Sequence, residues 1–115
     1  MLHGSCHCGA VTFTVEADPP EQAVACNCSH CRRKGFLLAF YGADRFRLEQ
    51  GEEALGSYLF NRHAITHRFC TTCGCQPFAE GTAPDGSATR AVNLRCVEEV
   101  DPDAIAVQHF DGAKL

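Results

Sequence analysis

Three cysteines fall within six residues in the run Cys26-Asn27-Cys28-Ser29-His30-Cys31. This spacing is typical of a metal site built from thiolates, because tetrahedral zinc with bonds of about 2.3 Å needs sulfurs roughly 3.8 Å apart. Three protein ligands leave the fourth position open for a reacting molecule, whereas a fourth ligand from elsewhere in the chain makes the site purely structural. The run by itself leaves both interpretations open. Candidates for a fourth protein ligand are His30, His67, Cys75 and Cys96.

Two further cysteine pairs end in a glycine, as Cys6-x-Cys8-Gly9 and Cys70-x-x-Cys73-Gly74. Glycine at these positions permits a positive φ and lets backbone amides turn toward the sulfurs, as a zinc knuckle requires. One zinc held by all four thiolates would form a closed structural site that contributes directly to folding. The alternative for the second pair is a redox motif, but no strand–helix context of that type surrounds it. This assignment leaves Cys75 and Cys96 as small core residues.

Bulk properties favour metal over disulfides as the role of the cysteines. The chain has 115 residues, nine of them cysteines, and its first residues lack the basic and apolar regions of a secretory signal. We therefore expect a cytoplasmic protein, in which disulfides are rare, folded as one domain over residues 1–115. No hydrophobic run reaches the roughly 20 residues that span a bilayer. The net charge of −4 argues against a nucleic-acid partner, since phosphates reward positive charge.

The sequence between and around these cysteines predicts short strands. Alternating or continuous apolar residues predict strands at 10–16, 23–25, 36–41, 46–49, 57–62, 64–69, 76–80, 91–96 and 106–110. The continuous run 36–41 predicts a fully buried strand, and the alternation over 91–96 places Val92, Leu94 and Cys96 on one face. Residues 29–34 predict one or two helical turns with Gly35 as the C-cap. No segment has sustained helical periodicity, so the fold class is all-β.

The order of the three cysteine motifs resembles that of the glutathione-dependent formaldehyde-activating enzyme family, whose domain also occurs in centromere protein V. Asn93-Leu94-Arg95-Cys96 and His109-Phe110-Asp111-Gly112 are similar to its C-terminal half. The resemblance implies an all-β, tent-like arrangement of antiparallel sheets held by zinc. It also implies two zinc ions per chain. The structural ion is assigned to Cys6, Cys8, Cys70 and Cys73, and the catalytic ion to Cys26, Cys28 and Cys31.

The activity that the resemblance implies is a carbon–sulfur lyase reaction that forms S-hydroxymethylglutathione from glutathione and formaldehyde, or acts on a related adduct. A thiol is the natural fourth ligand of a three-thiolate zinc, because zinc binds thiolate and deprotonates it on coordination. Arg32 could pair with a carboxylate of glutathione, and Asn27 and Ser29 could donate hydrogen bonds to bound sulfur. The alternatives are a non-catalytic glutathione carrier and a protein-interaction module with two structural zinc ions.

Overall fold

The computed structural model describes residues 1–60 and 64–114, and within them it contains ten strands and one six-residue α-helix. The expected all-β class is confirmed. A three-stranded sheet has the spatial order β1 (Leu2–Ser5), β2 (Thr12–Val15) and β5 (Phe46–Gln50). A seven-stranded sheet has the order β10 (Ala106–Phe110), β3 (Gln22–Cys26), β4 (Leu38–Gly42), β9 (Ala88–Asn93), β8 (Phe78–Thr82), β7 (Thr66–Cys70) and β6 (Leu55–Tyr58).

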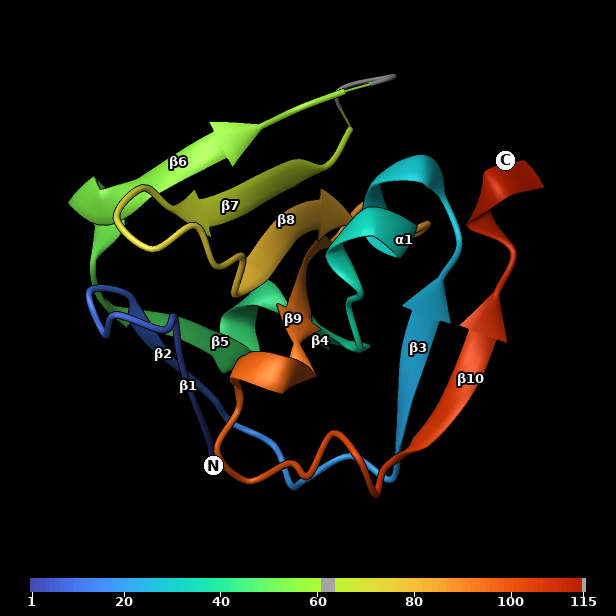
Figure 1. The fold of residues 1–115 in the computed structure, drawn as a ribbon, viewed down its shortest axis with the longest axis horizontal. Helices are drawn as coiled ribbons and strands as arrows, with labels where there is room; N and C mark the ends of the chain where they lie inside the picture. The colour runs from blue at the N-terminus through green and yellow to red at the C-terminus, as the bar shows by residue number, and fades with distance from the viewer. Residues whose placement is uncertain (61–63, 115) are drawn as a thin grey trace.

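Neighbouring strands in both sheets are antiparallel, apart from β10, which pairs with β3 in parallel. Figure 1 shows these two strands side by side at one edge of the molecule, and α1 (Ser29–Lys34) follows the end of β3. The parallel pairing brings the last described residues next to the cysteine run that follows β3. Among the described residues, no helix has the length and hydrophobicity needed to span a bilayer.

The main hydrophobic core lies between the two sheets. Phe13 of β2 is buried there and stacks on Phe46 of β5, with ring centroids 5.1 Å apart. The ring of Phe78 from β8 meets Phe13 edge-on at 6.1 Å. The other buried members of this cluster are Leu2, Val15, Ala23, Leu37, Val92, Leu94 and Val97.

Local sequence patterns predicted most of the strands and the helix correctly. The strand predicted at 106–110 is β10, and the helical turns predicted at 29–34 are α1, which ends at Gly35 with φ of 69°. The two hairpin strands predicted at 57–62 and 64–69 pair as β6 and β7, although β6 begins and ends earlier. Residues 61–63 of that prediction lie outside the described residues.

Two of the expectations about burial are wrong. The run 36–41 is not a fully buried strand: β4 begins only at Leu38, and Phe40 is 58% exposed because one face of β4 borders a cavity. The alternation over 91–96 also fails, because β9 ends at Asn93 and a 3₁₀ turn follows over Leu94–Cys96. The side chain of Asn93 accepts a hydrogen bond from the amide of Arg95 at 3.1 Å, which caps the turn and leaves Val92, Asn93 and Leu94 all buried.

Candidate metal centres and the adjoining cavity

The four cysteines of the two glycine-ended pairs come together in space. Cys6 and Cys8 follow β1, and Cys70 ends β7, yet their sulfurs and that of Cys73 all lie within 4.8 Å of one another. The Cys8 sulfur is 3.7 Å from the sulfurs of both Cys6 and Cys70. An edge of a tetrahedral zinc–thiolate site is about 3.8 Å, so this donor set fits zinc.

Backbone geometry around this four-sulfur cluster is that of two knuckles. Gly9 and Gly74 have φ of 83° and 79°, as the sequence predicted, and their amides donate to the carbonyls of Cys6 and Cys70. The amide of Val11 donates to the Cys6 sulfur at 3.3 Å. Hydrogen bonds from the amides of Cys75 and Cys8 lower the pKa of Cys73 to about 5. These amides therefore stabilise the Cys73 thiolate, the form that binds metal.

The other three cysteines form a second cluster with sulfurs within 4.8 Å of one another. Cys26 ends β3, Cys28 is the N-cap of α1, and Cys31 lies in its first turn, where its amide donates to the Cys28 sulfur at 3.3 Å. Burial and the neighbouring Cys28 sulfur raise the pKa of Cys31 far above its ordinary value. Three thiolates at this spacing repel one another, so a cation is needed to hold all of them deprotonated. A soft divalent ion such as zinc fits this donor set.

Within the described residues, the three-sulfur cluster has no fourth metal-binding side chain. The His30 ring instead packs against the rings of His67, Tyr58, Phe60 and Phe36, with the His67 centroid only 4.1 Å away. Cys75 packs against the buried cluster of Cys6, Val11 and Cys70, beside the other centre, and it is not one of the clustered sulfurs there. Burial and the nearby Cys75 raise the pKa of Cys96 to about 12, as expected for an inert core thiol.

A C-terminal segment covers the Cys26 side of this cluster. The side chain of Asn27 donates to Asp111 at 3.0 Å and accepts from the amide of Ala113 at 3.0 Å. A Cβ added to Gly112 would collide with the Cys26 sulfur and lie 3.5 Å from Cys28 Cβ. Asn27, which the sequence suggested as a donor to bound sulfur, therefore holds this segment in place. Gly112 had no signal of its own, because its contact with Cys26 spans most of the chain.

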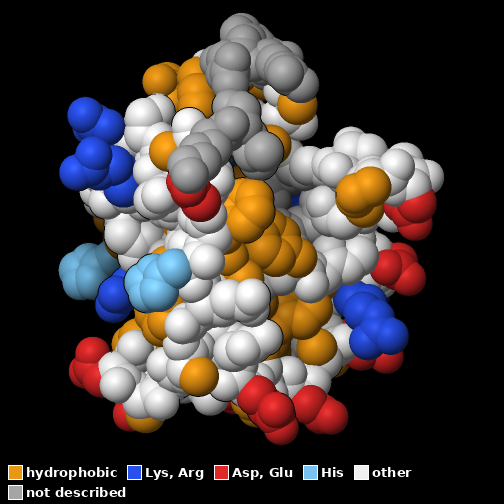
Figure 2. All heavy atoms as spheres, turned by 90° about the vertical axis from the view of Figure 1, so that its right-hand side faces the viewer, with side chains coloured by type: hydrophobic (Ala, Val, Ile, Leu, Met, Phe, Trp, Pro, Cys, Tyr) orange, Lys and Arg blue, Asp and Glu red, His pale blue; other side chains and the backbone are white. Residues whose placement is uncertain are grey.

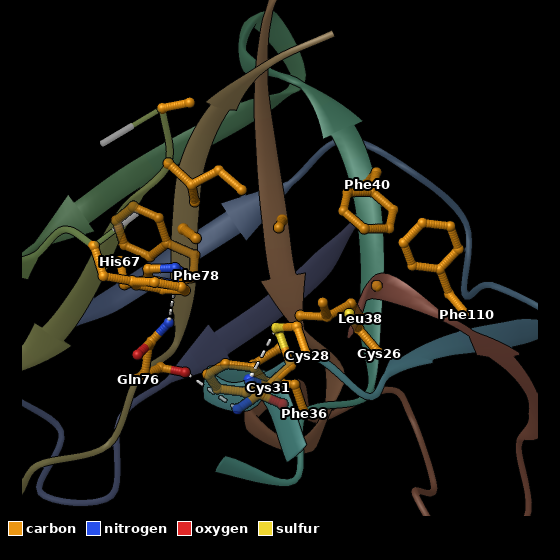
Figure 3. A pocket seen from close by; sticks show the side chains of 17 residues that line it. Cys26, Cys28, Cys31, Phe36, Leu38, Phe40, His67, Gln76, Phe78 and Phe110 are labelled. Carbon is orange, nitrogen blue, oxygen red and sulfur yellow. Dashed lines mark hydrogen bonds between the residues drawn. The ribbon is translucent and has the colours of Figure 1, made fainter. Parts of the chain in front are cut away.

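The three-sulfur cluster opens into a cavity of about 720 Å³. Figure 3 shows the three cysteines at the lower end of the view, with Phe40 and Phe110 on one side and His67, Gln76 and Phe78 on the other. Gln76 and His67 are hydrogen-bonded at 3.0 Å, and burial lowers the pKa of His67 to about 4, so its imidazole is neutral near pH 7. These wall residues come from β4, β7, β8, β10 and, for Gln76, the segment before β8, so sequence spacing could not group them.

The basic end of α1 lies outside the cavity lining. Arg32, Arg33 and Lys34 are all exposed, as is Ser29. The guanidinium of Arg33 donates to the carbonyl of Ser29 at 2.8 Å. The side chain of Arg32 makes no hydrogen bond or ion pair with any residue that the structure describes. The roles expected of Arg32 and Ser29 toward glutathione stay predictions.

Comparison with known proteins shows the family of this chain. A family model described as "Glutathione-dependent formaldehyde-activating enzyme" matches residues 1–110. The chain belongs to this family. It is similar to a Halomonas elongata protein that carries the family's name, with 32% identity over 81 residues, or 64% of this chain and 52% of that protein. The chain thus spans about half the length of the curated relative it matches. A crystal structure of a Rhodobacter sphaeroides protein has a TM-score of 0.79 and 32% identity, and the match covers 92% of this chain and 99% of that one.

The two centres should differ in their importance for folding. Cys70→Ser should abolish cooperative thermal unfolding, because the four-sulfur cluster links β1 to β7 and its metal contributes folding free energy. Cys28→Ser should lower the zinc content from two ions per chain to one and leave a cooperative transition. Cys75→Ser, outside both clusters, should keep both ions. Metal analysis with circular dichroism melts would measure this, and equal loss of structure in the first two variants would contradict the division.

Gly112→Ala should weaken metal binding at the three-sulfur cluster without unfolding the protein. The added methyl group must displace the Cys26 sulfur, and a displaced ligand should reduce metal affinity roughly tenfold. Gly81→Ala is a matched control, because the nearest atoms to its new Cβ are 3.8 Å away. Competition with a chelator would measure the affinity of each site. Unchanged metal affinity in Gly112→Ala would mean that the C-terminal segment does not constrain Cys26.

Proposed function

We propose that this protein is a zinc-dependent enzyme that joins glutathione to an aldehyde, a carbon–sulfur lyase-type reaction of which S-hydroxymethylglutathione formation is the family's named example. The observation that carries the proposal is the three-sulfur cluster of Cys26, Cys28 and Cys31, which has no fourth protein ligand among the described residues and lines a large cavity. A structural metal site is closed, whereas a site that binds substrate keeps a position open.

The reaction balances without an oxidant or reductant. The glutathione sulfur forms a bond to the carbonyl carbon, the π bond of the carbonyl breaks, and the thiol proton ends on the carbonyl oxygen. A zinc ion held by Cys26, Cys28 and Cys31 would supply an open position at which a soft thiol becomes a thiolate. The Cys31 amide stabilises charge on the Cys28 sulfur, and the apolar walls keep water away from the reacting atoms.

The exposed end of α1 is the natural contact for the charged ends of glutathione. Arg32, Arg33 and Lys34 follow directly after Cys31, so a peptide whose sulfur reaches the cluster passes close to these cations. Arginine pairs well with carboxylates, and Arg32 has its guanidinium free of other described partners. The described cysteines form no disulfides, in keeping with action in the cytoplasm, where thiols stay reduced.

Glutathione sulfur should become a ligand of the metal at the three-sulfur cluster. In protein loaded with cobalt, thiolate-to-cobalt charge-transfer absorption should rise when glutathione is added, and S-methylglutathione should leave it unchanged. Coordination releases a proton, so apparent affinity should strengthen as pH rises toward the free thiol pKa of roughly 8.5. The Cys28→Ser variant serves as the negative control. Equal binding of the thiol and its S-methyl analogue would rule out the sulfur as a ligand.

Arg32→Ala should weaken glutathione binding roughly two- to fivefold, the range measured for exposed ion pairs. The loss should shrink in high salt, which screens charges at the surface. Arg47→Ala, an exposed arginine of the other sheet, should bind glutathione as the wild type does. Calorimetric titration at low and high salt would provide the comparison, and an Arg32→Ala affinity equal to that of the control would remove this contact from the proposal.

A further inference from the structure

The cavity beside the three-sulfur cluster is far larger than formaldehyde requires. Its volume is about 720 Å³, whereas one water molecule in the liquid takes about 30 Å³. Formaldehyde has only two heavy atoms and would leave most of that space unfilled. Cavities of roughly 300–1,000 Å³ are the size that binds small organic molecules. The volume therefore points to a substrate with a sizeable substituent.

The walls of the cavity disfavour the binding of charged groups. Among the described residues that line it, there is no lysine, arginine, aspartate or glutamate, and the apolar walls include Phe40, Phe78, Ala91 and Phe110. Figure 2 shows hydrophobic side chains gathered across the middle of one face of the molecule, with charged side chains mostly toward its edges. The two carboxylates and the amino group of glutathione would have no charged partner among the described residues of these walls, so we place the charged parts of the peptide at the mouth.

The apolar space continues along the large sheet. A second cavity of about 290 Å³ shares Phe40, Ile65, Ala79 and Ala91 with the first. Where the two cavities meet, Ala91 of β9 is paired with Phe40 of β4 on one side and with Ala79 of β8 on the other. The small side chains of the two alanines leave space there. The smaller cavity adds Glu80, whose carboxylate already pairs with Arg68 at 3.1 Å and Arg90 at 3.5 Å. An elongated substituent can therefore run from the first cavity over Ala91 into the second.

We propose that this protein acts on aldehydes that carry an extended apolar substituent, which lies over Ala91 while the glutathione sulfur attacks the aldehyde carbon beside Cys26, Cys28 and Cys31. The inference rests on the proposed function and names the substrate class of that site. The adduct is the hemithioacetal: the glutathione sulfur bonds to the aldehyde carbon, and the thiol proton moves to its oxygen. The apolar chain contributes binding free energy in proportion to the area it buries.

The test is chain-length dependence in S-alkylglutathiones, which have no thiol and need no reaction. With zinc-loaded protein, the dissociation constant should fall at least tenfold from S-methyl- to S-hexylglutathione, since each buried methylene group lowers the dissociation constant by up to about fourfold. Ala91→Phe should remove most of that gain and leave S-methylglutathione binding unchanged, because the new ring fills the junction. Ala88→Phe makes the same change at an exposed position on β9 outside both linings and should keep the gain.

Turnover provides the second readout. Ala91→Phe should lower the ratio of kcat/KM for hexanal to kcat/KM for formaldehyde at least tenfold, whereas Ala88→Phe should leave that ratio within twofold of the wild type. Ala91→Leu adds a smaller side chain, so its kcat/KM with hexanal should lie between the values of the wild type and of Ala91→Phe. This variant keeps the test available if Ala91→Phe folds poorly. Equal affinity for the S-methyl and S-hexyl compounds in the wild type, or a full chain-length gain in Ala91→Phe, would overturn the inference. Failure of the proposed function would appear elsewhere, as a missing response of the cobalt protein to the glutathione thiol.

Discussion

The four-sulfur cluster is the constraint on which the rest of the structure depends. It joins the end of β1 to the end of β7, and the contact between Cys8 and Cys70 spans 62 residues of sequence. Backbone contacts also join β1 to the segment after β9: Gly4 forms a bridge with Val97, and the amide of Glu98 donates to the carbonyl of His3 at 2.9 Å. β7 also carries His67, three residues before Cys70, in the cavity wall. A metal bound at this cluster would therefore fix one wall of the cavity, although the cluster lies outside the cavity itself.

The reactive cluster and its cavity are built by different kinds of contact. Cys26, Cys28 and Cys31 belong to one short run, so the end of β3 and the first turn of α1 are enough to bring their sulfurs together. The walls instead require β4, β7, β8 and β9 of the large sheet, and the parallel strand β10 brings Phe110 and Gly112. The thiol chemistry that we propose would thus depend on a local sequence run, while the proposed selection among aldehydes would depend on the whole sheet.

The features that depend on local sequence could be predicted, and those that depend on long-range contacts could not. Both cysteine clusters, the positive φ of Gly9 and Gly74, and the Gly35 cap follow from spacing and the steric freedom of glycine, which are local. The exposed Phe40 could not be predicted, because an apolar residue that faces a cavity has the same sequence pattern as one that faces the core. The bend at Asn93 depends on a side chain that caps the next turn and donates to the carbonyl of Gln76. The parallel pairing of β10 and the contact of Gly112 with Cys26 are long-range.

Electrostatics links the metal cluster to the polarity of its cavity. Three thiolates around a divalent cation leave one net negative charge, and the described lining supplies no charged side chain to balance it. His67 does not balance it either, since burial holds the pKa of its imidazole at about 4. Charge interactions are strong in such a low-dielectric space, so a charged group that does not bind the cation is strongly disfavoured there. In the reaction that we propose, a thiolate would therefore enter only as a ligand of the cation, and the apolar walls would favour an uncharged carbonyl compound with a hydrocarbon chain.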